Sequence, residues 1–283
     1  MGIIKPMESS VEQIGERGAT RAQEEAYCAP TAKLTADRHG MRYHIKRLQR
    51  MQILSRFVLR NHVFSIKTSH KCIAFTFDDG PSGQITRDLV DLFEENDGKA
   101  TFFFQGDKAE QYSDSVRYAA ERHFTIANHS YDHPRYVDLP CTEVLQQIER
   151  TNKILMDITG ARPTMLRPPQ NVVSQWQALM IRIRCNQLII GCNIAPTDWA
   201  LSSPDDLAEF LIHAAQPGAI VCIHDGYPNT LNALKKALPA LRSDGKRRYV
   251  AFGEADQLCT DKIELVAGQR GCQQTDLSGR ALR

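Results

Sequence analysis

The chain has 283 residues, of which 42% are hydrophobic and 24% are charged, and its 35 basic and 33 acidic side chains leave a net charge of +2. This length allows one large domain with an extension, or two small domains. The balanced charge gives no sign of nucleic-acid binding or of attachment to a membrane surface. No apolar run approaches the ~18 residues of a membrane span, and Met1–Thr20 lacks the apolar core of a secretory signal. We therefore expect a cytoplasmic protein without a membrane span.

The 8 cysteines are scattered along the chain and form no C-x-x-C pair. A chain of this length does not need disulfide bonds to stabilise its core. We expect free thiols in a reducing compartment, with a disulfide framework as the alternative. Cys72 and Cys222 fall inside strand-like runs and are expected to be small core residues.

The N-terminal part, residues 1–68, differs in pattern from the rest and is interpreted as an extension. Its first 40 residues are polar with little periodicity, which is typical of disordered or loosely helical segments. Residues 41–60 are basic with interspersed apolar side chains, which predicts an amphipathic helix. This helix could pack on the main domain, or it could bind a partner or a membrane surface.

From residue 70 onward, short apolar runs alternate with longer helical patterns. This alternation is typical of a parallel sheet covered by helices, open or closed into a barrel. We expect a main domain at 69–259 and a loose tail at 260–283. The expected strands are 72–77, 100–104, 124–127, 164–166, 187–192, 219–223 and 249–252. The expected helices are 85–95, 113–122, 143–158 after a Thr142 cap, 176–184, 204–215 after a Ser203 cap, and 231–241.

Polar residues follow several of these strands, where active residues of parallel α/β folds collect. Each group alone has an ordinary structural explanation, since Asp-Asp-Gly is often a turn and histidines are often solvated or buried in a core. Their joint occurrence at one end of the expected sheet favours a functional site. The groups are Thr76-Phe77-Asp78-Asp79-Gly80, His129-Ser130-Tyr131-Asp132-His133, Arg167-Pro168-Pro169, Thr197-Asp198-Trp199 and His224-Asp225.

Two imidazoles four residues apart and one carboxylate can hold a divalent metal ion. His129, His133 and Asp79 would bind Zn²⁺ or another transition ion such as Co²⁺ and leave a position open for water. Asp78 could then act as general base and His224 as general acid. Adjacent residues at a strand end point in different directions, so Asp78 and Asp79 can divide these roles.

Over residues 70–255 the motifs resemble those of the polysaccharide deacetylases, carbohydrate esterase family 4 with its NodB homology domain, which includes the chitooligosaccharide deacetylases. Thr76–Gly80 is similar to the motif T-F-D-D-G, and His129–His133 to H-[ST]-x-x-H. Leu166–Pro169, Asp198-Trp199 and Ile220–Asp225 resemble three further motifs in family order. The resemblance implies a distorted (β/α)7 barrel.

The resemblance also implies a role for each site residue. The implied metal ligands are Asp79, His129 and His133, with Zn²⁺ as the first choice of metal. The implied catalytic residues are Asp78 as base, Arg167 orienting that base, and His224 as acid. The implied oxyanion and groove residues are Gln170 through its backbone N–H, Trp199, Pro168 and Pro169.

The sequence departs from the family pattern at four places. Gln170-Asn171 replaces an aromatic residue and Gly, although Asn tolerates a left-handed conformation. Ala195 stands where an Asp precedes the Trp by four residues, which we expect to weaken support of the catalytic groups and lower the pKa of a nearby His acid. Asp198 or Asp225 could substitute for that carboxylate. Cys222 replaces a Leu of the acetyl pocket, and His123 is interpreted as a surface turn residue.

The sequence thus predicts metal-dependent de-N-acetylation of an N-acetylglucosamine-containing oligosaccharide or a related amino sugar, with release of acetate. Gln170, Asn171 and Cys222 motivate a first alternative, a family member acting on another amide or ester. Ala195 motivates a second, a protein that binds metal or sugar without turnover. The sequence indicates no nucleic-acid partner and no particular oligomeric state.

Overall fold

The structure is a computed structural model that describes residues 62–67, 71–200, 203–243, 248–252 and 264–265. These residues belong to one compact unit, Gln49–Arg283. The amphipathic helix expected at 41–60 lies outside the described residues. None of the helices in the described part of the chain has the length and apolar character needed to span a membrane.

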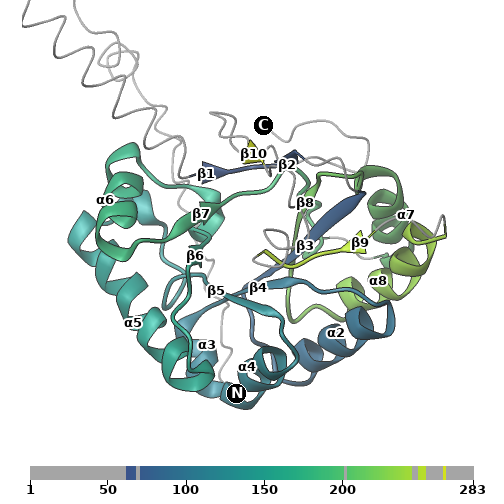
Figure 1. Ribbon diagram of the computed structural model, residues 1–283, viewed down its shortest axis with the longest axis horizontal. Coiled ribbons are helices and arrows are strands. Elements are labelled where there is room, and N and C mark those ends of the chain that lie inside the picture. Colours follow the sequence, from purple (N-terminus) through teal and green to yellow (C-terminus); the bar gives the residue numbers. More distant parts are fainter. Residues whose placement is uncertain (1–61, 68–70, 201–202, 244–247, 253–263, 266–283) are drawn as a thin grey trace, which may run out of the picture. The chain divides into compact units, whose positions relative to one another are not determined.

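A parallel sheet lies at the centre of the fold (Figure 1). Its strands run in the order β1 (His62–Val63), β7 (Leu188–Ile190), β6 (Met165–Leu166), β5 (Thr125–Asn128), β4 (Thr101–Phe104), β3 (Cys72–Asp78) and β8 (Ile220–His224). A further strand, β9 (Arg248–Tyr249), pairs in parallel with the start of β3. The short strands β2 (Ile66–Lys67) and β10 (Glu264–Leu265) form a separate antiparallel pair.

The ends of this sheet approach each other without a continuous ladder among the described residues. Beyond β7, Ile194 forms an isolated parallel bridge with Val221 of β8, and the N–H of Cys222 donates to the carbonyl of Ile194 at 2.8 Å. Pro196, which has no N–H to donate, follows two residues later. The expected α/β class and parallel sheet are confirmed, whereas the barrel is open in the described residues except for this bridge.

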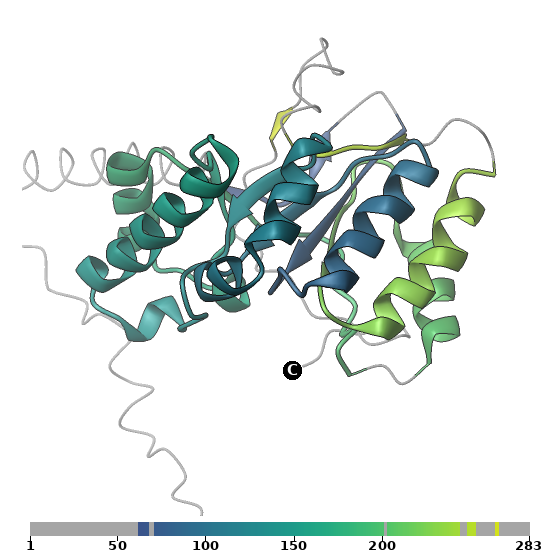
Figure 2. The same ribbon diagram turned by 90° about the horizontal axis from the view of Figure 1, so that it is seen from below.

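Helices surround the strands on their outer side (Figures 1 and 2). They are α2 (Gln84–Glu95), α3 (Gly106–Gln111), α4 (Ser113–Glu121), α5 (Cys141–Thr159), α6 (Gln175–Cys185), α7 (Pro204–Ala214) and α8 (Pro228–Leu241), with 3₁₀ turns η2 (Tyr136–Asp138) and η3 (Pro169–Asn171). The expected Ser203 cap is confirmed, since its hydroxyl accepts from the N–H of Asp206 at 3.3 Å. The expected Thr142 cap is wrong, because α5 already begins at Cys141 after Pro140.

Side-chain alternation along β3 and β8 separates the packing residues from the chemical ones. On β3, Phe75 and Phe77 belong to the core cluster that includes residues of α2 and α8, and Val221 and Ile223 of β8 join the same cluster. The alternate residues of both strands face the inner side of the sheet, where Ala74, Ile220 and Cys222 form a second cluster. Because this period places Thr76 and Asp78 on the inner side as well, the apolar pattern of β3 itself positions an acidic side chain there.

The chain around β1 and β10 departs from the expected boundaries. Residues 62–67, placed in the N-terminal extension by composition, form β1 and β2, and β1 pairs with β7 through His62–Ile189 and Val63–Ile190. Residues 264–265, placed in the tail, form β10. A strand of two residues is too short to show a periodic pattern in the sequence. Among the described residues, Cys141, Cys185 and Cys222 carry free thiols.

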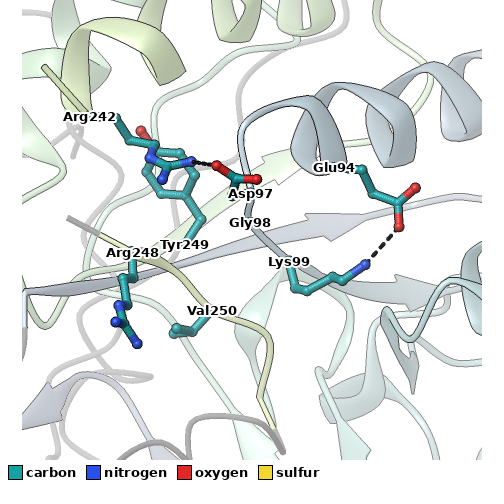
Figure 3. Close-up of a pocket in the computed structure, with 8 residues that line it drawn as sticks. All are labelled: Glu94, Asp97, Gly98, Lys99, Arg242, Arg248, Tyr249 and Val250. Carbon is teal, nitrogen blue, oxygen red and sulfur yellow. Dashed lines mark hydrogen bonds and ion pairs between the residues drawn. The ribbon is translucent and has the colours of Figure 1, made fainter. Parts of the chain in front are cut away.

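A cavity of about 460 Å³ opens at the amino-terminal end of β3 and β4 (Figure 3). Its charged side chains pair with one another, as Lys99 does with Glu94 at 2.8 Å and Arg242 with Asp97 at 3.2 Å. The groups singled out from the sequence lie at the other, carboxyl-terminal end of the strands. The candidate site is therefore built there.

Candidate active site

Three side chains converge next to the end of β3. The Oδ1 atom of Asp79 lies 3.4 Å from Nε2 of His129 and 3.4 Å from Nε2 of His133. One ligand atom from each of the three lies within 4.8 Å of the others. The structure therefore brings together the one carboxylate and two imidazoles that the sequence predicted as a metal-ligand set.

The turn after β5 aims both imidazoles at Asp79. Ser130 has a φ of 69° and His133 a φ of 61°, so the chain reverses tightly between the two histidines. The hydroxyl of Ser130 accepts from the N–H of His133 at 3.0 Å, and its own N–H donates to Oδ1 of Asn128 at 2.8 Å. This network explains the local sequence, because Asn128 and the Ser130 hydroxyl satisfy the polar backbone of a buried turn.

The metal-ligand set fits a divalent transition ion. The Nδ1 atom of His129 lies 2.8 Å from the carbonyl oxygen of Arg167, so the ring is held there and Nε2, which faces Asp79, is the atom that can bind a metal ion. Burial lowers the pKa of His133, which favours the neutral imidazole that a metal needs. Burial alone would raise the pKa of Asp79, but the hydrogen bond and charge of His129 and the charge of His133 hold it below its usual range.

Two residues at the start of α3 support Asp79 from the other side. The side-chain amide of Gln105 donates to Oδ1 of Asp79 at 2.8 Å, and Lys108 donates to the Asp79 carbonyl at 2.7 Å. Asp79 itself has a φ of 68°, a left-handed conformation that is uncommon outside glycine. These contacts hold the backbone in that conformation and turn Asp79 away from its neighbour Asp78.

Asp78 lies on the inner side of the sheet and pairs with a buried arginine. Its Oδ1 accepts from Nη1 of Arg167 at 2.7 Å, and Nη1 also donates to Thr76 at 2.7 Å. The other guanidinium nitrogens donate to the carbonyls of Ile190 and Gly191 at 3.0 and 2.9 Å. Burial alone would lower the pKa of Arg167, but the Asp78 carboxylate raises it above its usual range. The fixed guanidinium sets the orientation of the Asp78 carboxylate.

His224, at the end of β8, faces the same centre and is held by Asp198. The Nδ1 atom of His224 lies 2.7 Å from Oδ1 of Asp198, which is 1% exposed and also accepts from the hydroxyl of Thr230 at 2.8 Å. Burial opposes a charge on His224, but the hydrogen bond from its ring to Asp198, together with the charges of Cys222, Asp198 and Asp78, outweighs burial and raises the pKa of His224 to about 10. The imidazole therefore carries a proton at neutral pH and can give it up.

Among the predicted groove residues, Trp199 is the one whose contact with His224 is seen in the described part of the chain. The ring of Trp199 is perpendicular to that of His224, with centroids 4.6 Å apart, and Trp199 is 41% exposed. Gln170 is exposed, while Pro168 and Pro169 are buried beside it in the chain that follows Arg167. No contact between these three residues and the metal-ligand set is seen among the described residues.

A family model described as polysaccharide deacetylase matches residues 65–177. The chitooligosaccharide deacetylase of Rhizobium leguminosarum bv. trifolii is 31% identical over 189 residues, which cover 61% of this chain and 86% of that protein. The chain belongs to the polysaccharide deacetylase family.

Two further relatives extend the comparison. The peptidoglycan-N-acetylglucosamine deacetylase PgdA of Listeria monocytogenes serotype 1/2a is 32% identical over 208 residues, which cover 74% of this chain and 42% of PgdA. The chain thus spans less than half of the length of that relative. The solved structure of the peptidoglycan deacetylase PdaC from Bacillus subtilis superposes with a TM-score of 0.61 at 27% identity, covering 68% of this chain and 96% of that one.

Within this polysaccharide deacetylase fold, the effect expected from Ala195 is wrong. Ala195 is 7% exposed and packs in an apolar cluster. Asp198, one of the two substitutes considered, supports His224 directly, and the pKa of His224 is raised and not lowered. Asp225 instead accepts a hydrogen bond from Thr86 at 2.6 Å.

The other departures also have a structural outcome. Asn171 has a φ of 56° and Gln170 a φ of 58°, so both residues adopt the left-handed conformation that Asn tolerates. Cys222 is 3% exposed, and its thiol donates to Oδ2 of Asp78 at 3.3 Å. His123 is exposed with a φ of 59° in the turn after α4, as interpreted from the sequence.

Several supporting contacts of the site were not predicted from the sequence. Gln105 directly follows β4. It therefore lies at a strand end, like the residues that were considered, and could have been found in the same way. Thr76 lies two residues before Asp78 and therefore on the same side of the strand. Thr230 lies on α8, and only the folded structure brings it to Asp198.

Proposed function

We propose that this protein removes the acetyl group from N-acetylglucosamine units of an oligosaccharide or a related amino sugar, and that it uses Zn²⁺ to do so. The observation that carries the proposal is the convergence of a metal-ligand set, a buried carboxylate and a protonated imidazole at one end of the sheet. Asp79, His129 and His133 would hold the ion. When bound there, the ion polarises the acetyl carbonyl and lowers the pKa of a water molecule.

Asp78 takes the proton from that water. Its Oδ1 is occupied by Arg167, and its Oδ2 lies 3.9 Å from Nε2 of the metal ligand His129, so the free edge of the carboxylate faces the ligand set. Arg167 holds the base in a fixed orientation before the reaction, which lowers the cost of reorganising it. The water then adds to the carbonyl carbon of the amide.

His224 donates a proton to the amide nitrogen as the bond to the acetyl carbon breaks. Asp198 holds the ring by Nδ1, which leaves Nε2 to face the substrate. The raised pKa of His224 supplies the protonated form at neutral pH. The products are acetate and a free amino sugar.

The backbone N–H of Gln170 would stabilise the negative charge that develops on the acetyl oxygen. A backbone donor is independent of the side chain, so the exchange of an aromatic residue for Gln170 does not remove it. The exposed ring of Trp199 beside His224 would form one wall of the sugar groove.

The choice of substrate is supported by the relatives, which are named as deacetylases of chitooligosaccharides and of peptidoglycan N-acetylglucosamine. One observation favours a second candidate function, the hydrolysis of a different amide or ester. The thiol of Cys222 lies beside the base. The family pattern has Leu at this position, and Leu is larger than Cys. A smaller side chain there would admit a larger acyl group than acetyl.

The two functions separate in one assay of acyl-group release. The full chain, loaded with one equivalent of Zn²⁺, is incubated with N-acetylglucosamine oligomers of graded length and with N-propionyl analogues. Release of acetate that stops with a chelator supports the proposed function, and the preferred length defines the substrate. Faster release of propionate would support the second candidate, and no release of either with metal bound would contradict both.

A further inference from the structure

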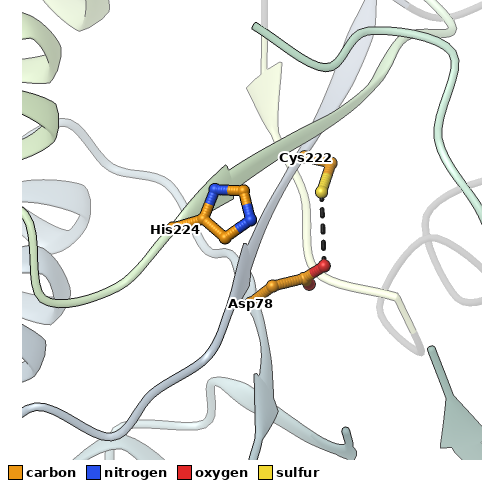
Figure 4. Close-up of side chains that lie close together, drawn as sticks. All are labelled: Asp78, Cys222 and His224. Carbon is orange, nitrogen blue, oxygen red and sulfur yellow. Dashed lines mark hydrogen bonds between the residues drawn. The ribbon is translucent and has the colours of Figure 1, made fainter. Parts of the chain in front are cut away.

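A second group of metal-binding side chains lies on the inner side of the sheet, next to the first. Asp78, Cys222 and His224 each offer one ligand atom, and these atoms lie within 4.8 Å of one another (Figure 4). The parallel register fixes this arrangement, because Asp78 pairs with His224 and Thr76 with Cys222. Cys222 and His224 are two residues apart on β8 and therefore point to the same side.

Asp78 and His224 are each held through one side-chain atom, which leaves a second atom of each able to bind a metal ion. Arg167 occupies Oδ1 of Asp78, so that Oδ2 faces the thiol of Cys222 at 3.3 Å. Asp198 occupies Nδ1 of His224, so that Nε2 is the ligand atom left to the imidazole. Arginine and carboxylate partners of this kind orient metal ligands from behind.

The three donors are chemically different from those of the first set. Sulfur, imidazole nitrogen and carboxylate oxygen together match Zn²⁺, Co²⁺ and Cd²⁺, and sulfur is a poor ligand for Mg²⁺ or Ca²⁺. Three protein ligands leave a position open for water. Asp79, His129 and His133 offer no sulfur, so the second group differs in a way that spectroscopy can detect.

The two groups are close enough to affect each other. Oδ2 of Asp78 lies 3.9 Å from Nε2 of His129, so an ion in each group would place two positive charges near each other. Repulsion between them makes the second ion bind more weakly than the first. We infer that Asp79, His129 and His133 fill first, because they carry no thiol proton that binding has to displace, and that the second group is occupied when metal exceeds one equivalent.

We propose that Asp78, Cys222 and His224 form a second site for a thiophilic divalent cation, and that its occupation inhibits the protein. Binding displaces the thiol proton of Cys222 and the Nε2 proton of His224, both of which pass to the solvent, and it occupies the carboxylate of Asp78 and the imidazole of His224. The inhibition rests on the proposed deacetylase function, whereas the binding of a second ion does not.

A titration with Co²⁺ tests the binding. The full chain is freed of metal with a chelator and titrated while absorption and bound metal are measured. The first equivalent gives no thiolate-to-cobalt charge-transfer band, and the second gives that band. Cys222→Ser, which keeps the size of the side chain, loses the band and the second equivalent but keeps the first. Cys141→Ala, at a partly exposed thiol on α5, retains both equivalents.

Binding of one equivalent only, or a charge-transfer band that survives in Cys222→Ser, overturns the site. The inhibition is tested by raising Zn²⁺ beyond one equivalent, with each variant compared with its own activity at one equivalent. Cys222→Ser requires about 100-fold more Zn²⁺ for half-inhibition than the wild type. Equal sensitivity overturns the inhibitory role. If neither protein releases acetate, the proposed function fails while the Co²⁺ titration still decides the site.

Discussion

One carboxylate, that of Asp198, fixes both the ring and the backbone of His224. Its Oδ1 lies 2.7 Å from Nδ1 of His224, and its Oδ2 accepts from the backbone N–H of the same residue at 2.9 Å. The contact joins the chain after β7 to the end of β8, close to the bridge between Ile194 and Val221. The support of His224 therefore depends on the same segment after β7 that bridges the gap between the two ends of the sheet.

Asp198→Asn should move the alkaline limit of activity to lower pH. Asp198 raises the pKa of His224 to about 10, and the acid works only below its pKa, so loss of the carboxylate lowers the pH at which activity falls. The expected displacement is about 1–3 pH units. It is measured from the pH profile of kcat/KM for acetate release. An alkaline limit that stays in place would show that another group controls it.

Arg167→Met should destabilise the fold by about 3–5 kcal/mol, because it leaves the buried Asp78 carboxylate without its partner. The same change in an Asp78→Asn background should cost less, since no buried charge is then left unpaired. Urea unfolding of the single and double variants measures the difference. Equal costs in both backgrounds would argue against a charge-based interaction of the two residues.

Ala195→Asp should lower stability by several kcal/mol without raising activity. Ala195 is buried in an apolar cluster, so a carboxylate there would be desolvated, and Asp198 already supports His224. Thermal unfolding and acetate release measure the two effects. A gain in activity would mean that the acid lacks support despite its contact with Asp198.

Gly80→Ala should cost about 1–3 kcal/mol and weaken metal binding. A Cβ atom at Gly80 would lie 2.2 Å from Oδ2 of Asp225, a carboxylate that the hydroxyl of Thr86 holds in place. The shift needed to relieve this overlap would be passed to the adjacent Asp79. Unfolding midpoints and Zn²⁺ affinity are the measurements.

Gly160→Ala is the comparison for that variant, because the space around Gly160 is open and its φ is +76°. It should cost about 1 kcal/mol from the left-handed conformation alone and leave Zn²⁺ affinity unchanged. Equal Zn²⁺ affinity in Gly80→Ala and the wild type would contradict the proposed link between Gly80 and the site.

The sequence sufficed for those parts of the fold whose residues are apolar and local. Six of the seven expected strands are present, because runs such as those of β3 and β8 are mostly apolar and buried on both sides. The seventh, expected at 249–252, shares only Tyr249 with β9. The helix α3 was not expected, since its six residues are mostly polar and too few to show a period. The short strands β1 and β2 were not predicted for a similar reason, since two residues are too few to show a period.

The metal-ligand set could be predicted because its residues lie within two local motifs at strand ends. The partner of His224 could not be assigned, because the sequence left Asp198 and Asp225 equally available. The choice is made by the chain after β7, which returns to β8 and buries Asp198 beside Thr230. A long-range contact of this kind has no local pattern.

The most direct test of the account compares the wild type with Asp78→Asn at the same content of bound Zn²⁺, on the N-acetylglucosamine oligomer that the wild type prefers. Because Asp78 is the proposed base and Asp79 the ligand, the variant should keep one equivalent of metal and lose about 100-fold or more of its acetate release. Full release by Asp78→Asn, with the metal still bound, would contradict the proposed mechanism.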